Sequence, residues 1–136
     1  MELPPYIKPY PWYFKYLPIS NHGFTTLAGK TIWLSQEIYD DLQRSNPKPL
    51  SISVLRHQEV HADGANFFKF FKFVTNKRFR LEEEEKAFKV MFRVLKENDE
   101  TVDLEFVAKN FAGLRYIWML SYDEALIVVK QFWNEV

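Results

Sequence analysis

Two of the three histidines in this 136-residue chain, His57 and His61, lie four positions apart in the stretch VLRHQEVHADG. Residues at positions i and i+4 of a helix lie about 40° apart around its axis, so both imidazoles can reach one metal ion. Two histidines that pack in a core and find hydrogen-bond partners there would show the same spacing, and this alternative stays open. The pair is therefore a candidate metal site that needs a further ligand.

The expected third ligand is Glu84, from a helix predicted over residues 81–97. The apolar stripe of that helix comprises Ala87, Phe88, Met91 and Leu95. Glu84 lies one turn before the stripe on the same side, whereas Glu82 and Glu85 should point outward and Glu83 is intermediate. Because two histidines and one carboxylate are an ordinary zinc ligand set, we predict one Zn²⁺ with water in the fourth position.

The histidines are expected on a long helix that begins at Ser51 or Ser53 and is weakened by Gly64. Its predicted solvent stripe is Arg56, Glu59, Asp63 and Asn66. Its predicted inward stripe is Val54, His57, His61, Ala65 and Phe68. The following run NFFKFFKF either continues this helix or begins another one.

Around these helices the sequence predicts a small β-structure and further helices. Alternating residues with a turn at Ala28-Gly29 indicate a β-hairpin over 24–34, and Ser35 should cap a helix over about 35–45. Another helix should end near Gly113, and a last helix should begin after Ser121. Residues 1–18, rich in proline and aromatic residues, are expected to form an extended arm against the domain. The predicted fold is a single α+β domain over 1–136, mainly helical.

The composition narrows the classes of partner. The chain has 18 basic and 18 acidic residues, so its net charge of zero gives no general attraction for nucleic acid. It has no cysteine, which excludes disulfides and thiolate metal sites. No apolar run is long enough to span a membrane, and the N-terminal stretch does not read as a secretory signal. We therefore expect a cytoplasmic protein without a membrane partner, and its oligomeric state stays open.

The metal-ligand pattern resembles that of small HExxH zinc metallopeptidases of the gluzincin type. In that family two histidines on one helix and a glutamate on a later helix bind zinc, and the glutamate often lies in an E-x-x-A motif. Here HQEVH supplies His57 and His61, and EEKA supplies Glu84. The resemblance is specific over roughly residues 50–90 and implies a minimal zincin-like fold, bound Zn²⁺ and hydrolysis of a peptide or protein substrate.

One residue departs from the family pattern. The family has glutamate after the first histidine, where it takes a proton from the zinc-activated water, and this chain has Gln58. An amide cannot act as a base at neutral pH, so hydrolysis should be absent or strongly impaired while zinc binding survives. Glu59 cannot replace it, because it lies about 200° around the helix from His57. Two explanations of Gln58 stay open. The isosteric exchange of Glu for Gln favours an engineered or otherwise inactivated peptidase, and the alternative is a natural zinc-binding pseudo-peptidase.

Supporting residues are less clear from the sequence. Tyr116 and His22 are candidates for stabilising an oxyanion, although packing or simple exposure explains either residue as well. Arg80 could bind a substrate carboxylate, although a surface ion pair accounts for it better. A second function class also stays open, in which the chain is a non-catalytic helical interaction module and both histidines are core residues.

Overall fold

The computed structural model describes residues 2–16, 23–26, 30–113 and 120–136. It is mainly helical with one small sheet, which confirms the α+β prediction. The strands are β1 (Ile7–Pro9), β2 (Gly23–Thr26) and β3 (Thr31–Leu34). The helices are α1 (Gln36–Leu42), α2 (Pro49–Ala62), α3 (Phe67–Thr75), α4 (Lys77–Glu97), α5 (Leu104–Phe111) and α6 (Tyr122–Asn134). None of the helices in these residues combines the length and hydropathy that a bilayer crossing requires.

The sheet has the order β1-β3-β2. The strands β2 and β3 pair antiparallel, as the predicted hairpin requires, although its predicted turn at 28–29 lies outside the described residues. The strand β1 pairs parallel with β3 and was not predicted. The N-terminal segment is therefore only partly an extended arm, since residues 7–9 join the sheet and Trp12–Tyr16 form a 3₁₀ helix. Pro9 is tolerated because β1 is an edge strand.

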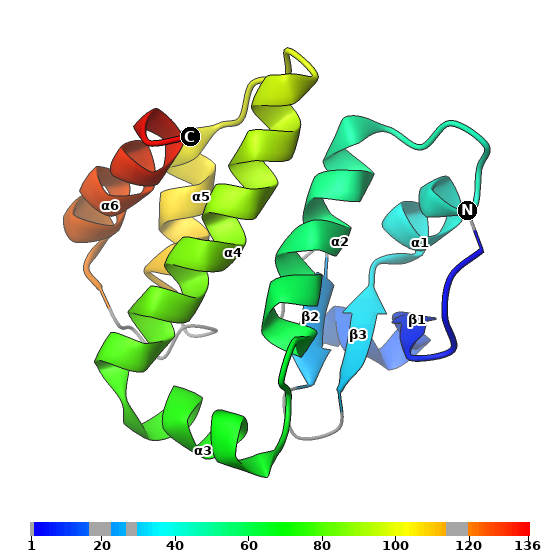
Figure 1. Cartoon of the computed structure of the whole chain (residues 1–136), viewed down its shortest axis with the longest axis horizontal. Helices are drawn as coiled ribbons and strands as arrows, with labels where there is room; N and C mark the ends of the chain where they lie inside the picture. The colour runs from blue at the N-terminus through cyan, green and yellow to red at the C-terminus, as the bar shows by residue number, and fades with distance from the viewer. Residues whose placement is uncertain (1, 17–22, 27–29, 114–119) are drawn as a thin grey trace.

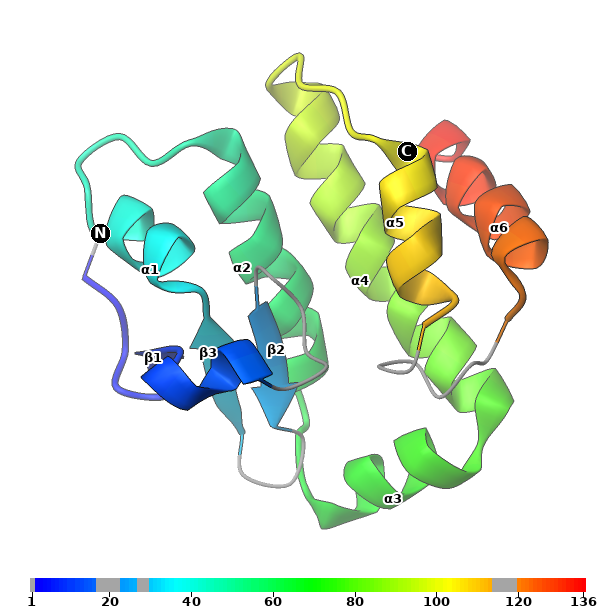
Figure 2. The ribbon, with the colours of Figure 1, turned by 180° about the vertical axis from the view of Figure 1, so that it is seen from behind.

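Two apolar clusters lie on either side of the contact between α2 and α4 (Figures 1 and 2). One cluster joins α4 to α5 and α6 around the fully buried Phe92 and Phe111. The other joins the sheet and α1 to α2 around the fully buried Ile32, Leu34 and Leu42. Helix α3 crosses from one half to the other at one end of the molecule. The polar groups between α2 and α4 thus lie between two apolar cores.

The histidine-bearing helix differs from its prediction at both ends. It begins at Pro49. Proline is tolerated in the first turn because the backbone N–H that it lacks would have no partner within the helix. It ends at Ala62, because Asp63 is extended and Gly64 has a φ of +66°. Asn66 instead caps the separate helix α3 through its side chain. The predicted solvent stripe therefore stops before Asp63, and the predicted inward stripe is wrong at Phe68, which is exposed.

Helix α4 also begins earlier than predicted. Asn76 caps it by accepting a hydrogen bond from the Phe79 N–H, so its first turn holds basic residues and no acid. A helix that began at residue 81, as predicted, would carry its glutamates in the first turn, where the helix dipole favours acids; the earlier start places them beyond that turn. At the start of α6, by contrast, the Ser121 hydroxyl accepts from the Glu124 N–H and donates to its carboxylate, which confirms the predicted cap.

Gly23 offers a test of how closely β2 lies against its neighbours. A Cβ atom added there would lie 2.9 Å from Leu34 Cδ2 and 3.0 Å from the Trp33 carbonyl oxygen. We expect Gly23→Ala to lower the free energy of unfolding by about 1–3 kcal/mol, because the strand must shift to admit the methyl group. Urea denaturation measures this change. Unaltered stability would contradict the close approach of β2 to β3.

Candidate metal centre

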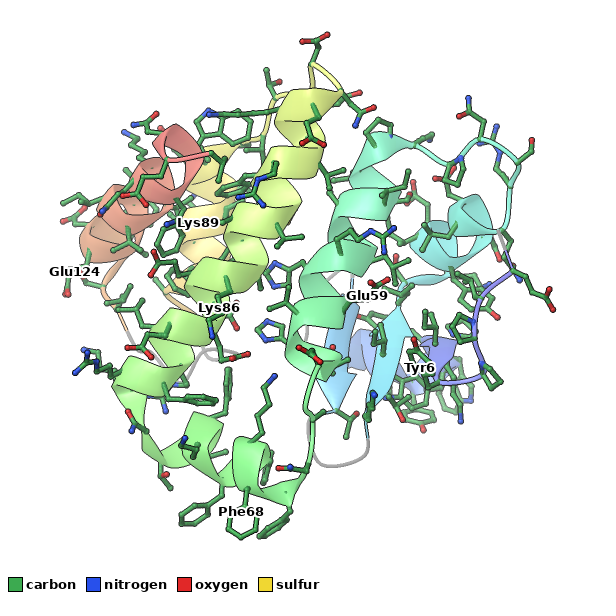
Figure 3. The ribbon with its side chains drawn as sticks, in the orientation of Figure 1. Tyr6, Glu59, Phe68, Lys86, Lys89 and Glu124 are labelled. Atoms are coloured by element: carbon green, nitrogen blue, oxygen red, sulfur yellow. The ribbon has the colours of Figure 1, made fainter. Side chains whose placement is uncertain are left out.

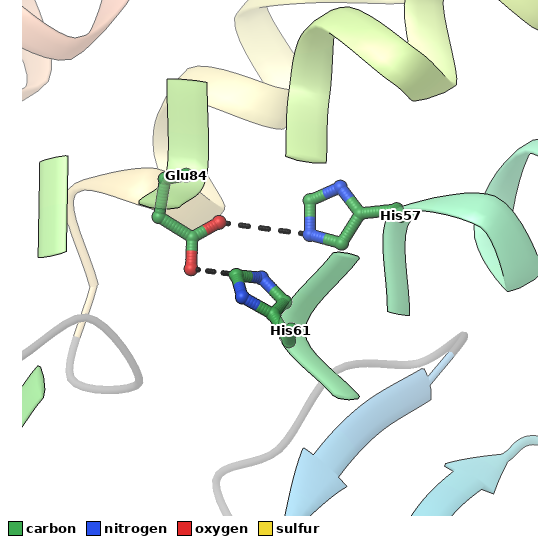
Figure 4. A group of neighbouring side chains, drawn as sticks. All are labelled: His57, His61 and Glu84. Carbon is green, nitrogen blue, oxygen red and sulfur yellow. Dashed lines mark ion pairs between the residues drawn. The ribbon is translucent and has the colours of Figure 1, made fainter. Parts of the chain in front are cut away.

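The structure brings together the three residues predicted as zinc ligands. His57 and His61 project from α2, and Glu84 projects from α4 toward them (Figure 4). Both imidazoles present Nε2 to the carboxylate, at 3.6 Å from Glu84 Oε2 for His57 and 3.2 Å from Glu84 Oε1 for His61. One ligand atom from each residue lies within 4.8 Å of the other two. The group can therefore hold a metal ion.

These separations suit a tetrahedral ion. With metal–ligand bonds of about 2.0–2.1 Å, two ligands of a tetrahedral zinc ion lie about 3.3 Å apart. Each imidazole Nε2 lies close to this distance from one oxygen of Glu84, Oε2 for His57 and Oε1 for His61. Glu84 is buried, and within the described residues no group donates a hydrogen bond to its Oε2 atom. A buried carboxylate oxygen without a donor is stabilised by a cation.

The pKa values show what holds the cluster together in the absence of a metal. Burial alone would lower the pKa of His61, but the negative charges of Glu84 and Glu83 outweigh it and raise the pKa to about 9. Burial alone would raise the pKa of Glu84, but the charge of His61 and the contact with His57 lower it to about 2. A proton on His61 thus compensates the buried carboxylate, and a metal ion must displace this proton to bind.

Two further charged residues, Glu83 and Lys69, contact His61: Glu83 lies beside its Nδ1 atom and Lys69 binds its carbonyl oxygen. Glu83 is buried, with its Oε2 atom 3.8 Å from His61 Nδ1 and 3.1 Å from Lys69 Nζ. Lys69 also donates to the backbone oxygens of His61 and Asp63, at 2.9 and 2.7 Å. A carboxylate beside the second nitrogen of a metal-binding imidazole favours the orientation that leaves the other nitrogen for the metal.

Sequence reasoning missed both of these supporting residues. Glu83 was expected to be intermediate in a run of four glutamates, and it is buried. Lys69 lies in a phenylalanine-rich run that carries no metal-site signal. Their relation to His61 depends on where α2 ends and α3 turns back, which the sequence pattern placed wrongly.

Gln58 points from α2 to the sheet, where both ends of its amide have a partner. Its Nε2 atom donates to the Gly23 carbonyl oxygen at 3.2 Å. Its Oε1 atom accepts from the Thr25 hydroxyl at 2.9 Å. A carboxylate could keep the bond from Thr25, but it would set a second oxygen against the Gly23 carbonyl. Gln58 thus joins helix α2 to the edge strand β2, beside the histidines.

Four other residues were singled out from the sequence, and the structure describes two of them, Arg80 and Glu59. Tyr116 and His22 lie outside the described residues. Arg80 is buried and donates to the carbonyl oxygens of Phe73 and Val74, so the expected surface ion pair is wrong. Glu59 pairs with Arg56 at 3.0 Å on the solvent side of α2, as predicted.

Comparisons of the chain with known protein families, curated proteins and solved structures gave no match.

The charge pairing in the centre predicts how the stability of the metal-free protein depends on pH. The raised pKa of His61 contributes stability that is fully present below about pH 6.5 and is lost as the pH rises through about 9. The lowered pKa of Glu84 contributes stability that is present above about pH 4.5 and is lost as the pH falls toward 2. We therefore expect this contribution to be largest between about pH 4.5 and 6.5.

Urea denaturation in the presence of a chelator, repeated at pH values from below about 4.5 to above about 9, measures the effect. A Glu84→Gln variant is the matched control, because it keeps the shape of the side chain and removes the charge that raises the pKa of His61. Its stability should change less between pH 6.5 and 9 than that of the wild type. Equal pH profiles for both proteins would contradict the pairing.

Proposed function

We propose that this protein binds one zinc ion through His57, His61 and Glu84, in a metallopeptidase-like centre that lacks its general base. The observation that carries the proposal is the buried convergence of two imidazoles and one carboxylate at zinc-like separations. Zinc is favoured over calcium or magnesium because imidazole nitrogens supply two of the three ligands. A zinc ion with three protein ligands supplies Lewis acidity and activates water.

The arrangement around the centre suits a peptide substrate or ligand. The strand β2 lies at the edge of the sheet and pairs only with β3 in the described part of the chain. It contacts α2 next to the histidines through Gln58. An extended peptide that adds to a sheet edge gains main-chain hydrogen bonds, and here it would lie beside the metal centre. The proposed ligand is therefore an extended segment of a peptide or protein.

The hydrogen bonds of Gln58 favour one version of this proposal. Because its amide donates to Gly23 and accepts from Thr25, glutamine fits the position better than glutamate does. This supports a natural zinc-binding pseudo-peptidase over the inactivated peptidase that the sequence alone favoured. In this version the chain holds zinc and an extended peptide without hydrolysing the peptide.

Zinc binding tests the centre directly. We expect the wild-type protein to bind one zinc ion, and His61→Ala or Glu84→Ala to weaken binding by more than the 10–100-fold typical of changes beyond the direct ligands. Competition against a chromophoric chelator measures the affinity, and inductively coupled plasma mass spectrometry measures the stoichiometry. Circular dichroism checks that each variant folds.

Glu82→Ala is the matched control, since Glu82 is an exposed carboxylate on the same helix that pairs with Arg78. It should leave zinc affinity unchanged. Zinc that stays substoichiometric after reconstitution would contradict the metal centre and favour an interaction module with core histidines. Unchanged affinity in Glu84→Ala would place the third ligand elsewhere.

Restoring the base tests the chemistry. We expect the zinc-loaded Gln58→Glu variant to hydrolyse an unstructured protein substrate about 10²-fold or more faster than the wild type, because it regains a proton acceptor. We also expect a loss of about 1–3 kcal/mol in the free energy of unfolding, because the bond to the Gly23 carbonyl is lost. Fluorescent casein and urea denaturation provide the two measurements.

The double variant Gln58→Glu with Glu84→Ala should return hydrolysis to background, which excludes a contaminating protease. If Gln58→Glu folds, binds zinc and still shows no hydrolysis, the centre is not peptidase-like. A stability equal to that of the wild type would contradict the argument that the position is built for an amide.

A further inference from the structure

Helix α3 exposes an unusual amount of aromatic surface. None of its residues is buried, and Phe67, Phe68 and Phe71 are 69%, 80% and 59% exposed. Phe70 and Val74 are also exposed. We call these five residues the phenylalanine face. Contiguous exposed apolar side chains of this kind mark sites of contact with a partner or a membrane.

Polar contacts hold this helix at its start, on its inner side and at its end. At its start the Asn66 side chain accepts from the Lys69 N–H. From its inner side Lys69 Nζ donates to the last carbonyl oxygens of α2 and pairs with Glu83. At its end Arg80 donates to the carbonyl oxygens of Phe73 and Val74. These contacts hold the helix while the residues of the phenylalanine face stay exposed. Phe73, which is not part of that face, is half-buried, and its ring centroid lies 6.3 Å from that of His61.

Exposed basic residues lie in and next to helix α3, although the chain as a whole is neutral. Residues 64–81 contain five basic residues and no acid, and the exposed Asp63 and Glu82 flank this range. Three of the basic residues are exposed, namely Lys72, Lys77 and Arg78. Arg78 pairs with Glu82 at 3.0 Å, but both side chains are solvent-exposed and such a pair contributes little. The exposed surface thus combines aromatic and cationic groups, which is complementary to an anionic interface.

We propose that helix α3 and the adjacent basic residues dock on the surface of an anionic lipid bilayer. Helix α3 lies at one end of the molecule, and Phe68 points away from it (Figure 3). An anionic bilayer offers an apolar interior beneath a negatively charged surface, which matches exposed aromatic side chains beside exposed cationic ones. The phenylalanines enter the interface between headgroups and acyl chains, and Lys72, Lys77 and Arg78 contact the lipid phosphates and carboxylates.

A second copy of the chain is a less favourable occupant. A two-fold symmetric contact through this face would bring the same residues of both copies together. Both copies would then bring Lys72, Lys77 and Arg78 into one contact, where like charges repel. The proposal departs from the sequence-based expectation of no membrane partner, which rested on the lack of a spanning segment.

Vesicle binding by the full chain tests the proposal. The probes are vesicles of phosphatidylcholine alone and vesicles with about 30 mol % phosphatidylserine. We expect binding to the anionic vesicles to be about tenfold stronger or more, and to weaken as salt is raised. The triple variant Phe67→Ser, Phe68→Ser, Phe71→Ser should lose about tenfold or more of this binding, as should Lys72→Gln with Lys77→Gln.

Matched controls lie on other elements. Ile127 on α6 and Trp12 in the 3₁₀ helix are 68% and 77% exposed, so serine at either position removes a comparable apolar group far from α3 in the sequence. Lys130→Gln on α6 is the control for charge, since Lys130 is also exposed. These three variants should bind anionic vesicles like the wild type.

Three outcomes would overturn the proposal. The first is no binding to anionic vesicles, and the second is equal binding to both kinds of vesicle. The third is a concentration-dependent dimer, seen by sedimentation velocity, that the triple serine variant abolishes, since the face would then be an interface between copies. Because these phenylalanines are not metal ligands, zinc binding by the triple variant separates failure of this proposal from misfolding.

Discussion

The carboxylate of Glu84, buried between two helices, is the constraint on which the arrangement of this protein depends. Helices α2 and α4 separate two apolar clusters, so the sheet half and the α4–α6 half meet at a polar contact. An uncompensated carboxylate there would cost several kcal/mol, and removal of its partners would leave that cost unopposed. The two imidazoles of α2 must therefore face α4. The positive charge that compensates Glu84 comes from a proton on His61 or from a metal ion.

The sequence could predict this contact because both of its sides follow helical periodicity. His57 and His61 need only the four-residue spacing, and Glu84 needs only the apolar stripe through Phe88 and Leu95. The predictions that were wrong concern residues near chain reversals, which helical periodicity does not encode. Gly64 at positive φ ends α2, so Phe68, placed inward by extending the helix, lies on a separate exposed helix.

The same limit explains the errors at Arg80, Glu83 and the N-terminal segment. Arg80 looked like a surface charge because its acceptors, the last carbonyl oxygens of α3, exist only once α3 ends before it. Glu83 gains its partners from α2 and α3 together. The strand β1 pairs with residues about 25 positions later, and a proline-rich stretch gives no local sign of this pairing.

Gln58 shows how a motif and a structure can assign one residue differently. In the HExxH pattern that the sequence resembles, the position of Gln58 is that of the general base, so the amide suggests that an activity has been lost. In the structure its Nε2 atom donates to Gly23 and its Oε1 atom accepts from Thr25, residues that lie 35 and 33 positions earlier in the chain. The amide therefore suits its surroundings. Lys69 connects this centre to α3, because it binds the carbonyl oxygen of His61 and the carboxylate of Glu83. Lys69 therefore contributes to the position of α3 and, through Glu83, to the charge beside the His61 ring.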